Sequence, residues 1–126
     1  EPMQINLADV HAELSAVFAA YEEALVINDV PRLDELFWDS SLTVRYGAGE
    51  NLVGIDAIRA FRNARSSVGL ARTLANTTIT TFGSDFATAM TEFQREGATK
   101  TGRQSQTWVR LPGGWRVVAA HVSLMA

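Results

Sequence analysis

The sequence predicts an α+β fold in which a curved antiparallel sheet wraps around three helices. In the first half of the chain, apolar residues recur at three- and four-residue spacing, as on one face of a helix. The second half consists of strand-like runs rich in Val, Thr and aromatic residues, separated by turn residues. No repeat or linker interrupts the 126 residues, so we expect a single domain spanning residues 1–126.

The first helix is predicted over residues 7–28, where the apolar positions share one face. Asn6 is its expected N-cap. A short second helix is expected over residues 31–37, because proline is favoured in the first turn of a helix. A third helix is expected over residues 55–65, with its apolar positions again at helical spacing.

A short hairpin is predicted between the second and third helices. Its strands cover residues 42–46 and 51–53, joined by Gly47-Ala48-Gly49. Four long strands follow the third helix, with strong turn signals at Gly83-Ser84-Asp85 and Leu111-Pro112-Gly113-Gly114. They are expected over residues 70–82, 86–96, 103–111 and 115–124.

The last two strands carry more polar residues than a plain hydrophobic hairpin would. These polar residues are Gln104, Ser105, Gln106, His121 and Ser123. Alternation puts Gln104 and Gln106 on one face of their strand, and His121 and Ser123 on one face of theirs. We therefore expect this hairpin to form a wall of a polar-lined cavity.

Composition excludes several classes of function. The net charge of −3 argues against a nucleic-acid or basic membrane surface. The absence of cysteine excludes disulfides, thiolate metal sites and a cysteine nucleophile. Only two histidines occur, so we expect no metal and no cofactor. No membrane span or signal peptide is evident, and we expect a cytoplasmic domain.

Several motifs along nearly the whole chain resemble the AtzH/HpxZ family, a SnoaL-like group within the nuclear transport factor 2 superfamily. They are Tyr21-Glu22-Glu23-Ala24-Leu25, Leu36-Phe37-Trp38-Asp39, Thr43-Val44-Arg45-Tyr46-Gly47-Ala48-Gly49-Glu50-Asn51, Gly54-Ile55-Asp56-Ala57-Ile58-Arg59-Ala60-Phe61-Arg62 and Gly102-Arg103-Gln104-Ser105-Gln106-Thr107-Trp108-Val109. The resemblance implies the cone-shaped, cystatin-like roll of that superfamily.

The resemblance also implies a function in nitrogen-compound catabolism. HpxZ-type members are associated with oxalurate breakdown. AtzH-type members are associated with cyanuric acid (s-triazine) breakdown, where they act beside a larger amidase and are thought to convert 1,3-dicarboxyurea to allophanate. By this resemblance the chain is a small amidase-type or carboxyl-releasing hydrolase.

Tyr21 and Arg45 are the candidate catalytic residues. Tyr21 lies in the apolar stripe of the first helix, so its hydroxyl either bonds a core carbonyl or points into a wet cavity, where it would donate a proton. Alternation separates Arg45 from Val44 and Tyr46 but does not say which face meets the cavity. The Val-Arg-Tyr-Gly motif of the family favours an inward Arg45 that holds a carboxylate bidentately.

Five further residues are candidate substrate-binding groups, each with a structural alternative. Arg72 is a second anion binder or a surface residue. Gln106 and His121 hold the remaining urea and carboxylate, and for His121 the alternative is a satisfied core residue. Glu92 is a base or the partner of an arginine, and Trp38 walls the pocket or packs in the core.

Two other functions stay open at this point. The chain is alternatively a non-catalytic ligand-binding protein or an accessory partner of the pathway amidase. A third hypothesis is proton transfer of the ketosteroid isomerase type, with Glu92 as the base. Because cone-fold proteins commonly pair through the outer face of the sheet, we expect a homodimer.

Overall fold

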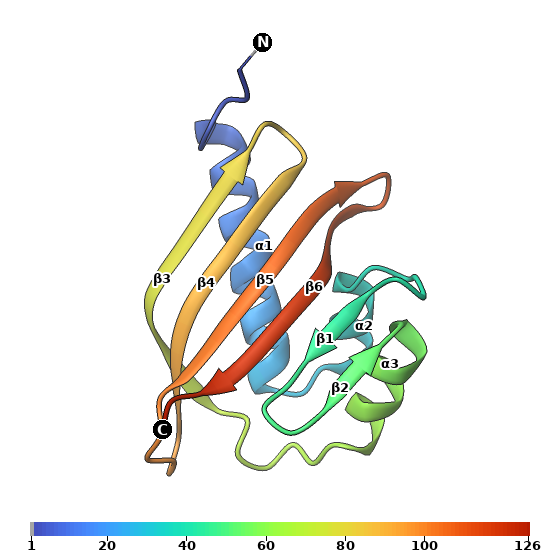
Figure 1. Cartoon of the computed structure of the whole chain (residues 1–126), viewed down its shortest axis with the longest axis vertical. Helices are drawn as coiled ribbons and strands as arrows, with labels where there is room; N and C mark the ends of the chain where they lie inside the picture. The colour runs from blue at the N-terminus through green and yellow to red at the C-terminus, as the bar shows by residue number, and fades with distance from the viewer. Residues whose placement is uncertain (1) are drawn as a thin grey trace.

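The computed structural model describes residues 2–126, which form one six-stranded sheet with helices packed on one of its faces (Figure 1). The fold is the predicted α+β roll. The helices are α1 (Ala8–Val26), α2 (Val30–Leu36) and α3 (Ile55–Ala64). The strands are β1 (Val44–Tyr46), β2 (Asn51–Val53), β3 (Arg72–Phe82), β4 (Phe86–Arg95), β5 (Gly102–Leu111) and β6 (Gly114–Leu124).

The sheet is mixed, in the order β2-β1-β6-β5-β4-β3. The four long strands form an antiparallel meander, and the short β1–β2 hairpin joins its edge because β1 runs parallel to β6. In this register Arg45 of β1 lies beside Ala120 of β6. The sequence predicted each of these strands but not the parallel pairing, which brings Arg45 next to the closing hairpin.

The helical side of the sheet, called the inner face below, holds the core. Leu14, Phe18 and Tyr21 of α1 pack toward Trp108 of β5 and Val117 of β6, and all five are at least 95% buried. The opposite, outer face carries the alternate residues of the strands and is uncovered in the single chain (Figure 1). Within residues 2–126, no helix is both long and apolar enough to cross a membrane.

The start of α1 differs from the prediction. Asn6 is not the N-cap; that position is Leu7, which makes no side-chain cap. Asn6 instead has a positive φ of 56°, and its Oδ1 accepts a hydrogen bond of 2.8 Å from the Thr81 amide of β3. The asparagine therefore fastens the N-terminal segment to the sheet edge. Its short amide side chain tolerates the left-handed backbone conformation that this requires.

Gly102, at the start of β5, is required by close packing against the neighbouring strand. It pairs with Phe93 of β4, whose buried ring lies over the glycine. A Cβ at position 102 would come within 2.1 Å of that ring. The sheet can bring β4 and β5 together at this end only because residue 102 has no side chain.

Gly102→Ala is expected to lower the free energy of unfolding by about 1–3 kcal/mol, since it overpacks a core aromatic ring. Urea unfolding followed by tryptophan fluorescence measures the change. Gly49→Ala is the matched control, because a Cβ at that glycine meets nothing within 4 Å. Equal stability of the two variants would contradict the packing role of Gly102.

Candidate functional site

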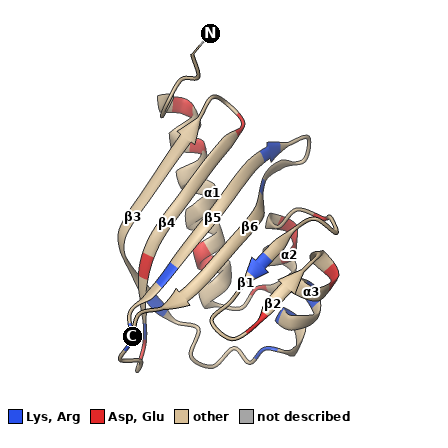
Figure 2. Ribbon diagram, in the orientation of Figure 1, with Lys and Arg blue, Asp and Glu red and all other residues tan. Residues whose placement is uncertain are grey.

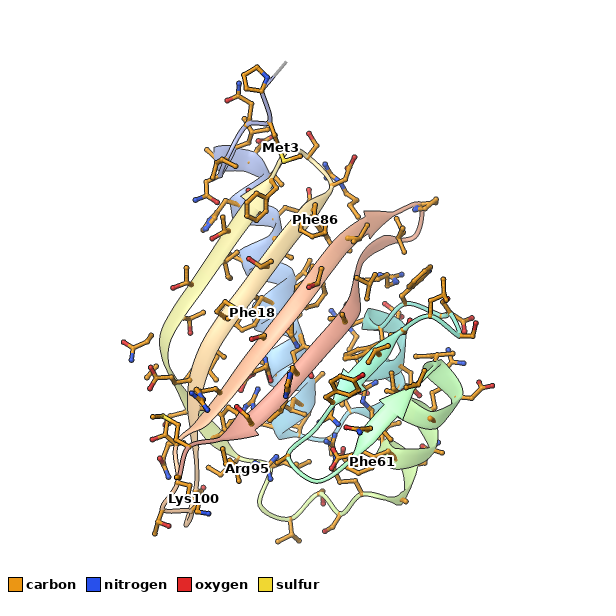
Figure 3. The ribbon with its side chains drawn as sticks, in the orientation of Figure 1. Met3, Phe18, Phe61, Phe86, Arg95 and Lys100 are labelled. Atoms are coloured by element: carbon orange, nitrogen blue, oxygen red, sulfur yellow. The ribbon has the colours of Figure 1, made fainter. Side chains whose placement is uncertain are left out.

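A cavity of roughly 530 Å³ opens at the end of the inner face where the C-terminus lies. Its wall combines side chains from β1, α3, β6 and the β4–β5 loop. Phe61, Arg95 and Lys100, three of the lining residues, lie at this end of the molecule (Figure 3), and Arg45 and Arg65 complete the basic part of the wall. Basic residues thus line one cavity of a chain whose net charge is negative. Figure 2 shows the positions of the Lys and Arg residues along the ribbon.

Arg45 lies on the inner face, with its side chain 12% exposed. Its Nη1 donates a hydrogen bond of 3.0 Å to Oε2 of Glu50, which lies in the β1–β2 turn. The guanidinium also lies 5.4 Å from the centre of the Phe61 ring, in cation–π range. The Glu50 carboxylate therefore already binds one donor of Arg45. A carboxylate ligand would contact the same guanidinium.

Two further arginines lie near Arg45: Arg65, the C-cap of α3, lines the cavity, whereas Arg62 of α3 is buried and is not a lining residue. Arg62 is 2% exposed and lies over the Phe37 ring at 4.1 Å, and its Nη1 bonds Asp34 at 3.3 Å. Burial lowers the pKa of both guanidinium groups, and the charge of Arg45 lowers each pKa further. Nη2 of Arg62 and both Nε and Nη2 of Arg65 are buried without an acceptor in the described chain.

Arg95 of β4 also lines the cavity, and its pKa is lowered in the same way. Burial lowers the pKa of its guanidinium, and the positive charges of Arg72 and Arg45 act in the same direction. The cavity therefore holds several cations that disfavour one another. Acceptor oxygens of an anionic ligand would relieve both the repulsion and the unpaired donors.

Tyr21 is buried beside this cationic group rather than on the wall of the cavity. Its ring contacts the rings of Phe37 and Trp108, each at 6.1 Å between centres. The phenol lies close enough to Arg62 and Arg65 to act on their charges. Tyr21 and Arg45 therefore lie in adjoining parts of one inner region, with α3 arginines near both.

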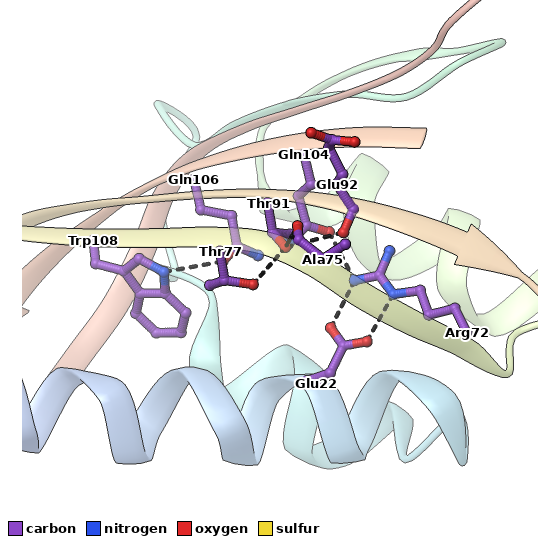
Figure 4. A network of polar contacts seen from close by, with 9 residues as sticks. All are labelled: Glu22, Arg72, Ala75, Thr77, Thr91, Glu92, Gln104, Gln106 and Trp108. Atoms are coloured by element: carbon purple, nitrogen blue, oxygen red, sulfur yellow. Dashed lines mark hydrogen bonds and ion pairs between the residues drawn. The ribbon is translucent and has the colours of Figure 1, made fainter. Parts of the chain in front are cut away.

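Arg72 is held by other protein groups. Its Nε and Nη2 each donate 2.7 Å hydrogen bonds to the Glu22 carboxylate, and Nη2 also reaches Oε1 of Gln104 at 3.0 Å (Figure 4). The guanidinium is 2% exposed and stacks on Phe93 at 4.5 Å. The prediction of Arg72 as a free second anion binder therefore needs correction, because its strongest donors are occupied; it joins α1 to the sheet and orients Gln104.

Gln106 lies on the inner face, 2% exposed, with its Oε1 accepting a hydrogen bond of 3.0 Å from the indole of Trp108. In Figure 4 both side chains point toward α1. The Gln106 Nε2 is buried and has no acceptor within residues 2–126, and the same holds for Nε2 of Gln104. Gln106 shares a row of the sheet with Arg45, since both pair with Ala120, but it is not among the residues that line the cavity.

Three predicted binding residues lie elsewhere, which corrects the expectation of one shared pocket. His121 is exposed on the outer face, where it pairs with Ser105 and stacks edge-on against Tyr46 at 5.7 Å. Glu92 also points outward, and its Oε2 accepts a hydrogen bond from Asn76. The strand partners of His121 and Glu92 each lie one position away from Gln104 or Gln106. Because side chains alternate between the two faces of a strand, His121 and Glu92 project from the face opposite to that of the two glutamines.

Trp38 is half-buried and bound through its main chain. Its amide donates to the Val117 carbonyl at 3.0 Å, and its own carbonyl accepts from Thr43 Oγ1 at 2.8 Å. It is not among the residues that line the cavity around Arg45. It is also not among the residues of the hydrophobic core, so neither predicted role of its ring is confirmed.

Sequence reasoning missed the α3 arginines, Arg95, Lys100 and Glu50. Arg62 follows Phe61 at the position where the apolar spacing of the helix continues, which was an available signal that it faces inward. In residues 2–126, no group of three or more His, Cys, Asp or Glu side chains has the arrangement of a metal site.

The family profile described as AtzH-like matches residues 3–126. A crystal structure of a protein of unknown function from Pectobacterium atrosepticum, assigned to the DUF3225 family, is 65% identical, with a TM-score of 0.95 over 97% of this chain and 95% of that one. A cystatin-like fold protein from Burkholderia xenovorans is 49% identical, with a TM-score of 0.95 over 98% of both chains.

A nuclear transport factor 2-like superfamily protein from Salmonella enterica is 24% identical, with a TM-score of 0.76 over 94% of this chain and 93% of that one. At that identity it supports the fold alone. Together these structures confirm the predicted cone-shaped, cystatin-like roll. No curated protein matches the chain.

Arg65→Gln is expected to stabilise the ligand-free protein by about 0.5–1 kcal/mol at neutral pH. The lowered pKa means that folding disfavours the charged form, and this cost is present at every pH below the folded pKa, neutral pH included. Urea unfolding measures the gain. Arg59→Gln, which breaks only the exposed 3.5 Å pair with Asp39, is the control and should change stability little. A loss of stability in Arg65→Gln would contradict the repulsion.

Proposed function

Because the chain belongs to the AtzH-like family, we propose that it is a small enzyme that removes one carboxyl group from a carboxylated urea, with 1,3-dicarboxyurea as substrate and allophanate as product. The observation that carries this proposal is the cationic cavity lined by Arg45, Arg65 and Arg95, where the buried Nε and Nη2 of Arg65 have no acceptor in the described chain. A small ligand with carboxylates at both ends supplies the missing negative charge and the missing oxygens.

The proposed reaction breaks one C–N bond. The electron pair of that bond goes to nitrogen, the carboxylate carbon leaves as carbon dioxide, and the nitrogen takes up one proton. Arg45 would hold a carboxylate, in the place where it now contacts Glu50, and would stabilise negative charge as it moves. The Tyr21 phenol, whose ordinary pKa is about 10, suits the donor of that proton better than a base.

Arg45 and Tyr21 are tested by turnover of 1,3-dicarboxyurea by the purified protein, followed as carbon dioxide and allophanate formation. Arg45→Ala is expected to lower kcat/KM at least about 100-fold through loss of a charge-assisted anchor. Tyr21→Phe is expected to lower kcat by about 10²–10⁴-fold, which is the usual contribution of a general acid. Arg59→Ala, which changes an exposed arginine of α3, should retain activity.

Three outcomes would contradict parts of this proposal. Turnover only in the presence of the pathway amidase would support an accessory role in place of an enzyme. Ammonia release in place of carbon dioxide would indicate hydrolysis of the amide bond. Full activity of Tyr21→Phe would remove the phenol from the reaction.

We also propose that the chain forms a homodimer through the outer face of the sheet. Tyr46, Phe86 and Met90 are 41%, 41% and 48% exposed there, which is unusual for large apolar side chains. Glu92 and Arg103 are paired neighbours on β4 and β5, so a two-fold axis can set each against its opposite charge in a second copy.

Light scattering is expected to give twice the 13.7 kDa mass of the chain. Met90→Glu should shift the protein toward the monomer, because it places a charge at the centre of the apolar contact. Pro2→Glu, a charge added at an exposed site in the N-terminal segment, is the control and should remain dimeric. A monomeric wild-type protein would contradict the proposal.

A further inference from the structure

The inner face of the sheet carries two buried glutamines whose amide orientation is determined by their partners. The Trp108 indole N–H is a donor only, and so is the Arg72 guanidinium. Each must face the oxygen of its amide: Trp108 bonds Oε1 of Gln106 at 3.0 Å, and Arg72 bonds Oε1 of Gln104 at 3.0 Å. The NH₂ end of each glutamine is therefore directed away from its partner, as a donor.

Both NH₂ groups are unsatisfied in the ligand-free protein. Gln104 and Gln106 are 3% and 2% exposed, and neither Nε2 has an acceptor within the described chain. A buried donor without an acceptor costs about 1–3 kcal/mol. Two such groups on one strand, each oriented by a donor-only partner, point to a ligand that brings acceptor oxygens.

The register of the sheet places Gln106 and Arg45 in one row, with Ala120 between them. Gln106 pairs with Ala120, and Ala120 pairs with Arg45, so the three side chains form one row across β5, β6 and β1. At roughly 4.8 Å per strand, the Cα atoms of Gln106 and Arg45 lie about 10 Å apart. The residue between them is an alanine that keeps 9% of its surface exposed although it lies in the core. The only side chain between the Arg45 guanidinium and the Gln106 amide in this row is therefore the methyl group of Ala120.

We infer that Gln106 binds the uncharged central oxygen of the substrate while Arg45 binds a terminal carboxylate. This inference rests on the proposed function and adds a specificity residue to it. A neutral amide N–H matches a neutral carbonyl oxygen, whereas the guanidinium groups match the charged ends. As the C–N bond breaks, negative charge moves toward the urea carbonyl, so the Gln106 hydrogen bond strengthens at that stage. Trp108 is a positioning residue, because it fixes which end of the amide faces the ligand.

Two five-carbon dicarboxylates test the inference by calorimetry. Glutarate and freshly dissolved 3-oxoglutarate have the same carbon chain and the same charge, and 3-oxoglutarate alone carries a central carbonyl oxygen. The wild-type protein is expected to bind 3-oxoglutarate about tenfold more tightly, since only that ligand satisfies the buried donor. Gln106→Met keeps the length of the side chain but removes the NH₂ donor, and its preference should fall to about onefold while glutarate affinity stays unchanged.

Gln4→Leu, an exposed glutamine of the N-terminal segment, is the matched control and should keep the tenfold preference. Trp108→Phe serves as a second variant if Gln106→Met does not fold: it frees the amide to turn, so the preference should fall there too. The ratio of the two affinities within one variant does not depend on its stability.

The outcomes separate this inference from the proposed function. Equal binding of both dicarboxylates by the wild type, or a preference that survives in Gln106→Met, would overturn the role of Gln106 and leave the cationic site intact. Binding of neither dicarboxylate would overturn the proposed function and this inference together.

Discussion

The interior of this protein is constrained by guanidinium groups that lie close together with too few acids to balance them. Arg45, Arg65 and Arg95 line one cavity, and Arg62 is buried close to it. Burial lowers the pKa of Arg62, Arg65 and Arg95, and the charge of Arg45 lowers each of them further. Such a cluster costs free energy of folding in the empty protein, since charged groups prefer water to a partly dry interior. An anion bound in the cavity offsets that cost. Ligand binding is therefore expected to raise the free energy of unfolding of the protein.

Two carboxylates determine how the cluster is arranged. Glu22 binds Arg72 bidentately from α1, which joins the first helix to the long strands and removes Arg72 from the set available to a ligand. Glu50 binds Arg45 through one nitrogen only, at the open end of the cavity. The first pair is closed and supports the wall. The second leaves donors of Arg45 available, which supports the carboxylate-binding role proposed for that residue.

The local patterns of the sequence predicted nearly all helices and strands, because turn residues and apolar periodicity are short-range signals. Alternation along a strand also placed Gln104 with Gln106, and His121 with Ser123, correctly. It could not say that these two sets face opposite sides of the sheet, because that depends on the pairing of Ser105 with His121. Asn6 was misassigned for a similar reason: its partner, Thr81, lies 75 residues away. The cationic cavity forms only when β1 pairs with β6 and α3 packs beside them. Local residue spacing predicts neither of these long-range contacts.

The same geometry bears on the isomerase-type alternative, in which a carboxylate abstracts a proton inside an apolar pocket. Glu92, the acid that the sequence offered for this role, lies on the outer face and bonds Asn76. Glu50 and Glu22, the acids beside the cationic region, are held by Arg45 and Arg72 at 3.0 and 2.7 Å. A proton abstraction would have to free one of these ion pairs first, at the cost of leaving a guanidinium unpaired. The proposed loss of a carboxyl group needs no such carboxylate base, because it moves negative charge from a carboxylate onto nitrogen beside cations that already line the cavity.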